Sequence, residues 1–101
     1  MATLYITEFA DLSVSFIRGN LAQAAAQPPV VDQTPLAIGA ATQSTAFAAT
    51  TTLVRLHCDS VCSVLFGTNP TATTANARMA AGQTEYFGVA PGMKVSVIAN
   101  T

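Results

Sequence analysis

The stretch LVRLHCDSVCSVLFG at residues 53–67 decides the fold, because apolar and polar side chains alternate on both sides of a short turn. Alternating residues of an extended strand point to opposite faces, so one face of each half is apolar. The residues on that apolar face are Val54, Leu56, Cys58, Cys62, Val64 and Phe66. With residues 59–61 as the loop, Cys58 lies opposite Cys62 in a β-hairpin, and the two apolar faces agree.

A second alternating stretch lies near the C-terminus, where Met93, Val95, Val97 and Ala99 alternate with Lys94, Ser96 and Ile98. Pro91 and Gly92 before it suit positions i+1 and i+2 of a type II turn. This predicts a second hairpin, formed with residues 86–89.

Short apolar segments at residues 36–38, 44–47 and 77–79 complete the β pattern, and turn residues separate them. The polar segment 71–76 is either a contact loop or a solvated one. The spacing predicts an all-β fold, a small β-sandwich or jelly-roll-like domain of about seven or eight short antiparallel strands.

The N-terminal third differs from the rest of the chain in its residue pattern, which suggests a division into an extended arm at 1–34 and a sandwich at 35–101. It holds alternating pieces at 4–7 and 12–17 and an Ala-rich segment at 21–27 that could form one or two helical turns. Pro28 and Pro29 then predict an extended connector, because proline lacks the backbone donor of a helix or ladder. The sequence leaves open whether this third is an arm or simply the first strands of the domain.

The chain carries few charges: four Lys and Arg and five Asp and Glu residues among 101, with half of all residues hydrophobic. About a quarter of an ordinary soluble domain is charged. Such a surface is expected to be covered by other subunits, in a homo-oligomer or a larger assembly. The net charge of −1 and the scattered cations predict no nucleic-acid partner. No stretch has the length of a membrane span or the pattern of a signal peptide, so we expect no membrane partner and cytoplasmic synthesis.

Cys58 and Cys62 have three interpretations. As zinc ligands they would need His57 and Asp59, but no second ligand pair exists, and His57 and Cys58 point to opposite strand faces. A cross-strand disulfide fits the hairpin register, although thiols stay reduced in a cytoplasm. Two free, buried cysteines are the favoured interpretation.

No pattern in the chain indicates catalysis or a cofactor. His57 is the only histidine, the five carboxylates are dispersed, and no Gly-x-Ser-x-Gly elbow or phosphate-binding loop occurs. We therefore expect no enzyme activity, no catalytic or metal-ligating residues, no cofactor and no small-molecule substrate.

Three segments together resemble small virion proteins of tailed bacteriophages, of the head decoration or cement type. They are LVRLHCDSVCSVLFGTNPTA at 53–72, MAAGQTEYF at 79–87 and VAPGMKVSVI at 89–98. The shared features are FGTNPTA, A-G-x-x-E-x-F and P-G-x-K-V-x-V-I, and no catalytic motif is among them. The N-terminal third has no counterpart in the resemblance.

The resemblance implies a structural protein of the virion that binds the major capsid protein on the phage head surface and stabilises contacts between capsid subunits. A dimer and a trimer both fit. Alternatives are a tail, fibre or head-tail adaptor subunit, or a carbohydrate- or receptor-binding β-sandwich. The candidate partner contacts are Leu4, Tyr5, Ile6, Phe9, Leu12, Val14, Phe16, Val30, Val31 and Leu36.

Overall fold

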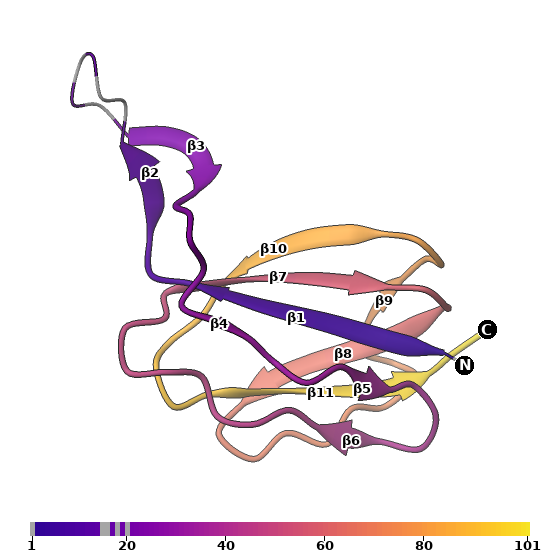
Figure 1. Cartoon of the computed structure of the whole chain (residues 1–101). Helices are drawn as coiled ribbons and strands as arrows, with labels where there is room; N and C mark the ends of the chain where they lie inside the picture. The colour runs from indigo at the N-terminus through magenta and orange to yellow at the C-terminus, as the bar shows by residue number, and fades with distance from the viewer. Residues whose placement is uncertain (1, 15–16, 18, 20) are drawn as a thin grey trace.

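The computed structural model describes residues 2–14, 17, 19 and 21–101, and this part of the chain is all-β (Figure 1). Its strands form three antiparallel sheets, which confirms the predicted fold class. The strands are β1 (Thr3–Phe9), β2 (Leu12–Val14), β3 (Leu21–Ala25), β4 (Val31–Asp32), β5 (Leu36–Ala37), β6 (Thr42–Gln43), β7 (Leu53–Cys58), β8 (Cys62–Gly67), β9 (Ala77–Met79), β10 (Thr84–Gly88) and β11 (Lys94–Ala99).

Two of the sheets form a sandwich. The five-stranded sheet has the order β10-β7-β1-β4, with β5 pairing the same edge of β1 as β4, and the four-stranded sheet has the order β6-β11-β8-β9. The buried residues between them form one core: Leu4, Ile6, Ile38, Phe47, Val54, Leu56, Cys58, Cys62, Val64, Met79, Val95 and Val97. Each fully buried aliphatic side chain of this kind stabilises the fold by about 1.5–3 kcal/mol.

The third sheet is the hairpin β2–β3, which projects from one end of the sandwich (Figure 1). Leu12 pairs with Ala25 and Val14 with Leu21, with an irregularity between the two pairs. The Ala-rich segment is therefore a strand and not the helical turn that its composition suggested. Alanine has the highest helix propensity of all residues, but here the backbone hydrogen bonds of the segment go to β2.

The two predicted hairpins are wrong in their pairing, although their buried faces are correct. β7 pairs with β1 and β10, whereas β8 pairs with β11 and β9, so residues 59–61 carry the chain from one sheet to the other. The turn at Pro91 and Gly92 likewise joins β10 of one sheet to β11 of the other. Gly92 has φ 82° and the amide of Met93 donates to the carbonyl of Ala90 at 3.3 Å, as expected for the type II turn.

The N-terminal third does not form an arm along its whole length. β1 is an inner strand of the five-stranded sheet, paired with β7 over six residues and with β4 and β5 on its other side. The expected boundary between residues 34 and 35 therefore does not separate two structural units. Of this third, the hairpin β2–β3 is the part that projects (Figure 1).

Candidate functional site

Three of the predicted partner contacts, Leu4, Ile6 and Phe9, are buried within the chain itself. Leu4 and Ile6 lie on the inner face of β1 within the core, and Phe9 is buried beside Tyr86, with ring centroids 6.3 Å apart. The apolar side chains of Leu4 and Ile6 serve the core of the sandwich, because β1 supplies an inner strand. None of the three presents a surface to another protein.

The other predicted contacts have different surroundings. Tyr5 and Val30 are exposed by 45% and 37%, and Leu12 lines a pocket. Val31 and Leu36 are half-buried, and Leu36 packs against the core. The side chains of Val14 and Phe16 lie outside the described residues. Tyr5, Val30 and Leu12 therefore stay predicted contacts.

Part of the outer face of the four-stranded sheet is covered by the chain itself. Residues 68–76, here called the strap, connect β8 to β9, and Pro70 and Ala72 of the strap are buried. The amide of Ala72 donates to Ser96 Oγ on β11 at 2.9 Å, and both residues are buried. The loop predicted at 71–76 therefore has a structural role on this sheet face.

Both ends of the strap are held by amide side chains. Gln43 Nε2 on β6 donates to Asn69 Oδ1 at 2.9 Å and to the carbonyl of Pro70 at 2.6 Å. Asn100 Nδ2 donates to the carbonyl of Thr74 at 3.2 Å and to Ser63 Oγ at 2.7 Å. These bonds tie the strap to β6, β8 and the C-terminal segment.

The outer face of the five-stranded sheet, in contrast, gathers both tyrosines of the chain and its only histidine. Directly paired residues of antiparallel strands point to the same face. Tyr5 pairs with His57, His57 with Thr84, and Arg55 with Tyr86, so these side chains form adjacent rows. The tyrosine rings are exposed, Tyr86 by 53%, and His57 Nδ1 lies 2.7 Å from Thr84 Oγ1.

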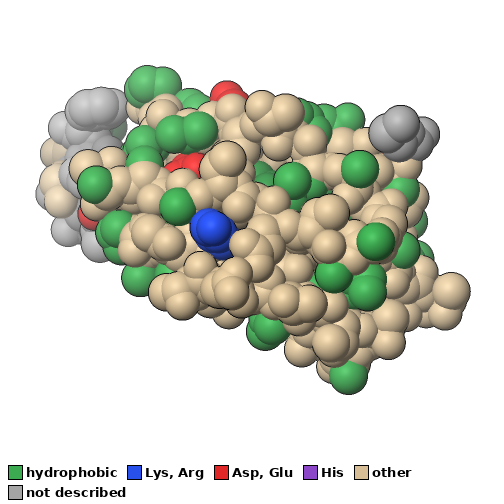
Figure 2. Space-filling model, turned by 90° about the horizontal axis from the view of Figure 1, so that it is seen from below, with side chains coloured by type: hydrophobic (Ala, Val, Ile, Leu, Met, Phe, Trp, Pro, Cys, Tyr) green, Lys and Arg blue, Asp and Glu red, His purple; other side chains and the backbone are tan. Residues whose placement is uncertain are grey.

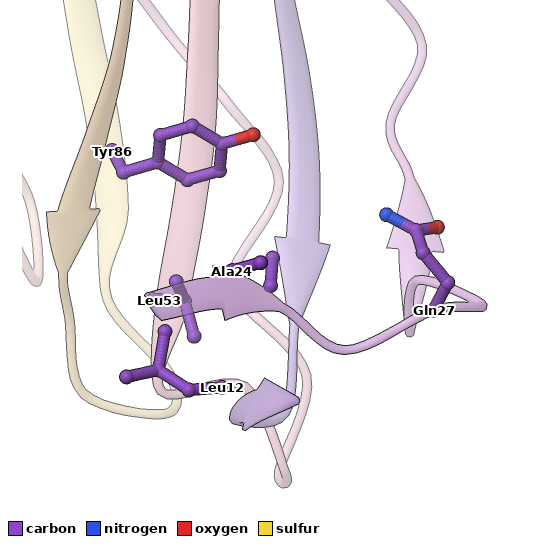
Figure 3. A pocket seen from close by; sticks show the side chains of 6 residues that line it. Leu12, Ala24, Gln27, Leu53 and Tyr86 are labelled. Carbon is purple, nitrogen blue, oxygen red and sulfur yellow. The ribbon is translucent and has the colours of Figure 1, made fainter. Parts of the chain in front are cut away.

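A pocket of about 770 Å³ lies where the hairpin meets this outer face (Figure 3). Its lining residues are Leu12, Ala24, Ala25, Gln27, Leu53 and Tyr86. The volume falls within the range of about 300–1,000 Å³ typical of ligand pockets. Because the lining is apolar apart from one amide and one phenol, it suits an apolar side chain.

Among the described residues at the end of the hairpin, Ile17 is an exposed apolar side chain. Ile17 is 93% exposed, far more than the other exposed large hydrophobic residues in the described part of the chain. Because the Ile17 side chain is not buried by the rest of the chain, it contributes no hydrophobic burial to the stability of the fold.

Charged side chains are sparse on the surface as well as in the composition. Figure 2 shows one face of the molecule, most of which is backbone and uncharged polar side chains, with hydrophobic groups scattered among them. Lys, Arg, Asp and Glu side chains are few on this face. This matches the low proportion of charged residues in the sequence.

Glu8 is the one buried acidic residue among those that the structure describes. Its Oε1 accepts hydrogen bonds from the amide of Ala48 at 2.8 Å and from Thr51 Oγ1 at 2.7 Å. Its Oε2 accepts a bond from Gln33 Nε2 at 2.7 Å. The carboxylate therefore joins β1 to two loops, which is a structural role.

The two cysteines are free and buried, which confirms the favoured interpretation. Cys58 Sγ donates to the carbonyl of Ala80 at 3.1 Å. Burial, together with the neighbouring Cys58, raises the pKa of the Cys62 thiol from about 9 to about 12. The Cys62 thiol is therefore a protonated, unreactive group of the core at neutral pH.

His57 and Cys58 lie on opposite faces of β7, as expected. Within residues 2–14, 17, 19 and 21–101, no three His, Cys, Asp or Glu side chains are grouped to hold a metal ion. Nor do these residues contain a helix of the length and apolarity needed to cross a membrane.

No family model, no curated protein and no solved structure matches the chain. The outer face of the five-stranded sheet and its pocket were not predicted from the sequence. Tyr5, His57 and Tyr86 lie far apart along the chain, and only the strand register brings them together.

Proposed function

We propose that the chain is a structural, non-enzymatic virion protein that decorates an assembled phage head by binding the major capsid protein. The observation that carries this proposal is the difference between the two sandwich faces. The strap covers part of one face, whereas the other is left with exposed aromatic rings, an apolar pocket and a hairpin that ends in an exposed isoleucine. Exposed apolar groups of this kind mark interaction surfaces. The capsid as the partner, and the virion as the location, rest on the resemblance of residues 53–98.

Decoration would stabilise the head through many weak contacts. A copy that contacts two capsid subunits at once gains affinity by avidity. Because it binds the assembled shell and not separated subunits, it shifts the equilibrium toward the shell by mass action. A low surface charge suits this role, since an uncharged interface loses little solvation when it is covered.

The proposal is tested by adding the purified protein to heads that lack it and measuring the bound fraction by co-sedimentation. Ile17→Ser and Tyr5→Ser should each weaken binding by roughly tenfold or more if these residues anchor the contact. Leu65→Ser is the matched control, because Leu65 is a partly exposed apolar residue on the strap-covered sheet. Unchanged binding of both variants would contradict the proposed surface, and no binding of the wild-type protein would contradict decoration itself.

A tail, fibre or adaptor subunit is distinguished by copy number in purified particles. Quantitative mass spectrometry should find the chain in proportion to the major capsid protein if it decorates the head. A proportion matching the tail proteins would support this alternative.

One observation favours a second candidate, a carbohydrate- or receptor-binding sandwich. The two tyrosines share one exposed face with Arg55 and His57, which provides aromatic rings beside polar groups. Specific binding to a glycan array, lost in the Tyr5→Ser variant, would favour this candidate over decoration.

A further inference from the structure

β10 is an edge strand of the five-stranded sheet, and one side of its backbone is unoccupied. The amide of Cys58 donates to the carbonyl of Gln83, and the amide of Val89 donates to the carbonyl of Thr52. Since hydrogen-bonding direction alternates along an antiparallel strand, Glu85 and Phe87 also face β7. The backbone groups of Thr84, Tyr86 and Gly88 therefore point away from the sheet.

These outward groups have no hydrogen-bond partner among the described residues, and all three residues are exposed. Sheet edges are commonly protected by Lys, Pro, a bulge or a covering loop. β10 contains neither Lys nor Pro, and its five residues pair with β7 without a bulge. The one charged residue is Glu85, which belongs to the opposite row of side chains.

We propose that β10 pairs with β10 of a second copy of this chain, antiparallel and about a two-fold axis at Tyr86. In this register Tyr86 lies opposite Tyr86 of the second copy, and Thr84 lies opposite Gly88. Each of these pairs exchanges two N–H···O bonds, so every outward donor and acceptor is satisfied.

A second copy suits this edge because the strand is self-complementary in that register. Each Glu85 lies opposite Phe87 of the second copy, so the two carboxylates are not directly opposed. The two Tyr86 rings lie side by side on the outer face, next to the pocket they help to form.

The pairing predicts a dimer and excludes a trimer through this edge, because antiparallel pairing of identical strands has two-fold symmetry. The axis runs perpendicular to the sheet, so both outer faces lie on the same side of the dimer. The contact involves a single short strand on each side. The surface area it buries is therefore less than the roughly 1,000 Å² that a stable interface needs. We therefore expect a weak dimer. This inference goes beyond the proposed function and needs no capsid.

The experiment is sedimentation equilibrium of the full chain over roughly 1 μM to 1 mM, a range that covers weak affinities. Wild-type protein should move from monomer to dimer with concentration. Tyr86→Pro should stay monomeric, because it removes an outward N–H that the pairing with β7 does not use. Tyr86→Ala keeps that N–H and should weaken the dimer less than Tyr86→Pro. Protection of the buried thiols shows that each variant is folded.

A cross-link tests the register independently of any loss of stability. Tyr86→Cys should form a disulfide-linked dimer on oxidation, because Cα atoms of a hydrogen-bonded pair lie about 5.5 Å apart, within disulfide range. Thr84→Cys is the control, since its counterpart in the second copy lies about 13 Å away along the strand.

A monomer at all concentrations overturns the proposal. So does a dimer that Tyr86→Pro leaves intact, or a Thr84→Cys variant that cross-links as readily as Tyr86→Cys. These results are obtained without capsids, so they are distinct from a failure of the proposed function.

Discussion

At the scale of single residues, two buried groups show how the core accommodates polar atoms. Glu8 accepts hydrogen bonds from three neutral donors, and no cation is among its partners in the described part of the chain. Every buried side-chain nitrogen and oxygen in the described part of the chain has a partner. A buried polar group costs little when it is hydrogen-bonded, but removing its partner exposes the full desolvation cost.

Glu8→Ala is expected to lower the free energy of unfolding by about 2–4 kcal/mol, because it leaves the half-buried amide of Ala48 and the buried hydroxyl of Thr51 unpaired. Urea denaturation monitored by circular dichroism measures this loss. Glu85→Ala is the control: among the described residues this exposed carboxylate accepts a bond from Gln83 alone, and its removal should cost about 0.5 kcal/mol or less. Equal losses in the two variants would contradict the structural role of Glu8.

The raised pKa of the Cys62 thiol predicts how the free energy of unfolding changes at alkaline pH. Its pKa of about 12 in the folded state exceeds the ordinary value of about 9, so the folded protein binds more protons between these values. The stabilisation contributed by the protonated Cys62 thiol is fully present below about pH 9 and is lost as pH rises toward 12. Urea midpoints should therefore fall with pH above 9, and less steeply in Cys62→Ala. Identical slopes in the two proteins would contradict this prediction.

At the scale of elements, the turns show which part of a local pattern is reliable. Pro91 and Gly92 form the turn that their residue types predict, and residues 59–61 also form a short connection. Each connection nevertheless joins strands of different sheets. Strands on the two sides of a sandwich both direct their apolar face to the core, so the alternation is the same as in a hairpin. Period-two patterning therefore predicted the faces of β7, β8 and β11 but not their partners.

The strap provides a prediction at this scale. Ser96→Ala leaves the buried amide of Ala72 without an acceptor, which should cost about 1–3 kcal/mol. The amide of Ala72 should also exchange with deuterium faster than in the wild-type protein. Thr71→Ala, an exposed change in the same strap, is the control and should alter neither quantity. If Ala72 exchanges at the wild-type rate in Ser96→Ala, the strap is held by other contacts.

At the scale of the whole molecule, the N-terminal residues belong to the sandwich and the hairpin does not. β1 connects β7 to β4 and β5, whereas β2 and β3 pair with each other. The apolar residues of the N-terminal third therefore serve two purposes. Leu4 and Ile6 complete the core, and Leu12 lines the pocket beside the outer face.

Removing residues 1–10 should prevent folding, because it takes an inner strand out of the five-stranded sheet. Replacing residues 13–24 by a short turn should leave a folded sandwich, since this segment lies outside both large sheets. Protection of Cys58 and Cys62 from alkylation at neutral pH distinguishes the two results. A folded protein without residues 1–10 would show that β1 is dispensable.

The sequence by itself determined the all-β class, the buried face of each strand in 53–67 and 93–99, and the scarcity of charge. The fold class and the buried faces follow from the alternation of apolar and polar side chains along each strand, which involves only neighbouring residues. The scarcity of charge follows from composition alone. Tertiary structure decided that β1 is an inner strand, that β7 and β8 face each other across the core, and that Tyr5, His57 and Tyr86 meet on one surface. The physical reason is that strand pairing depends on contacts between residues distant in the chain, and several pairings bury the same apolar faces.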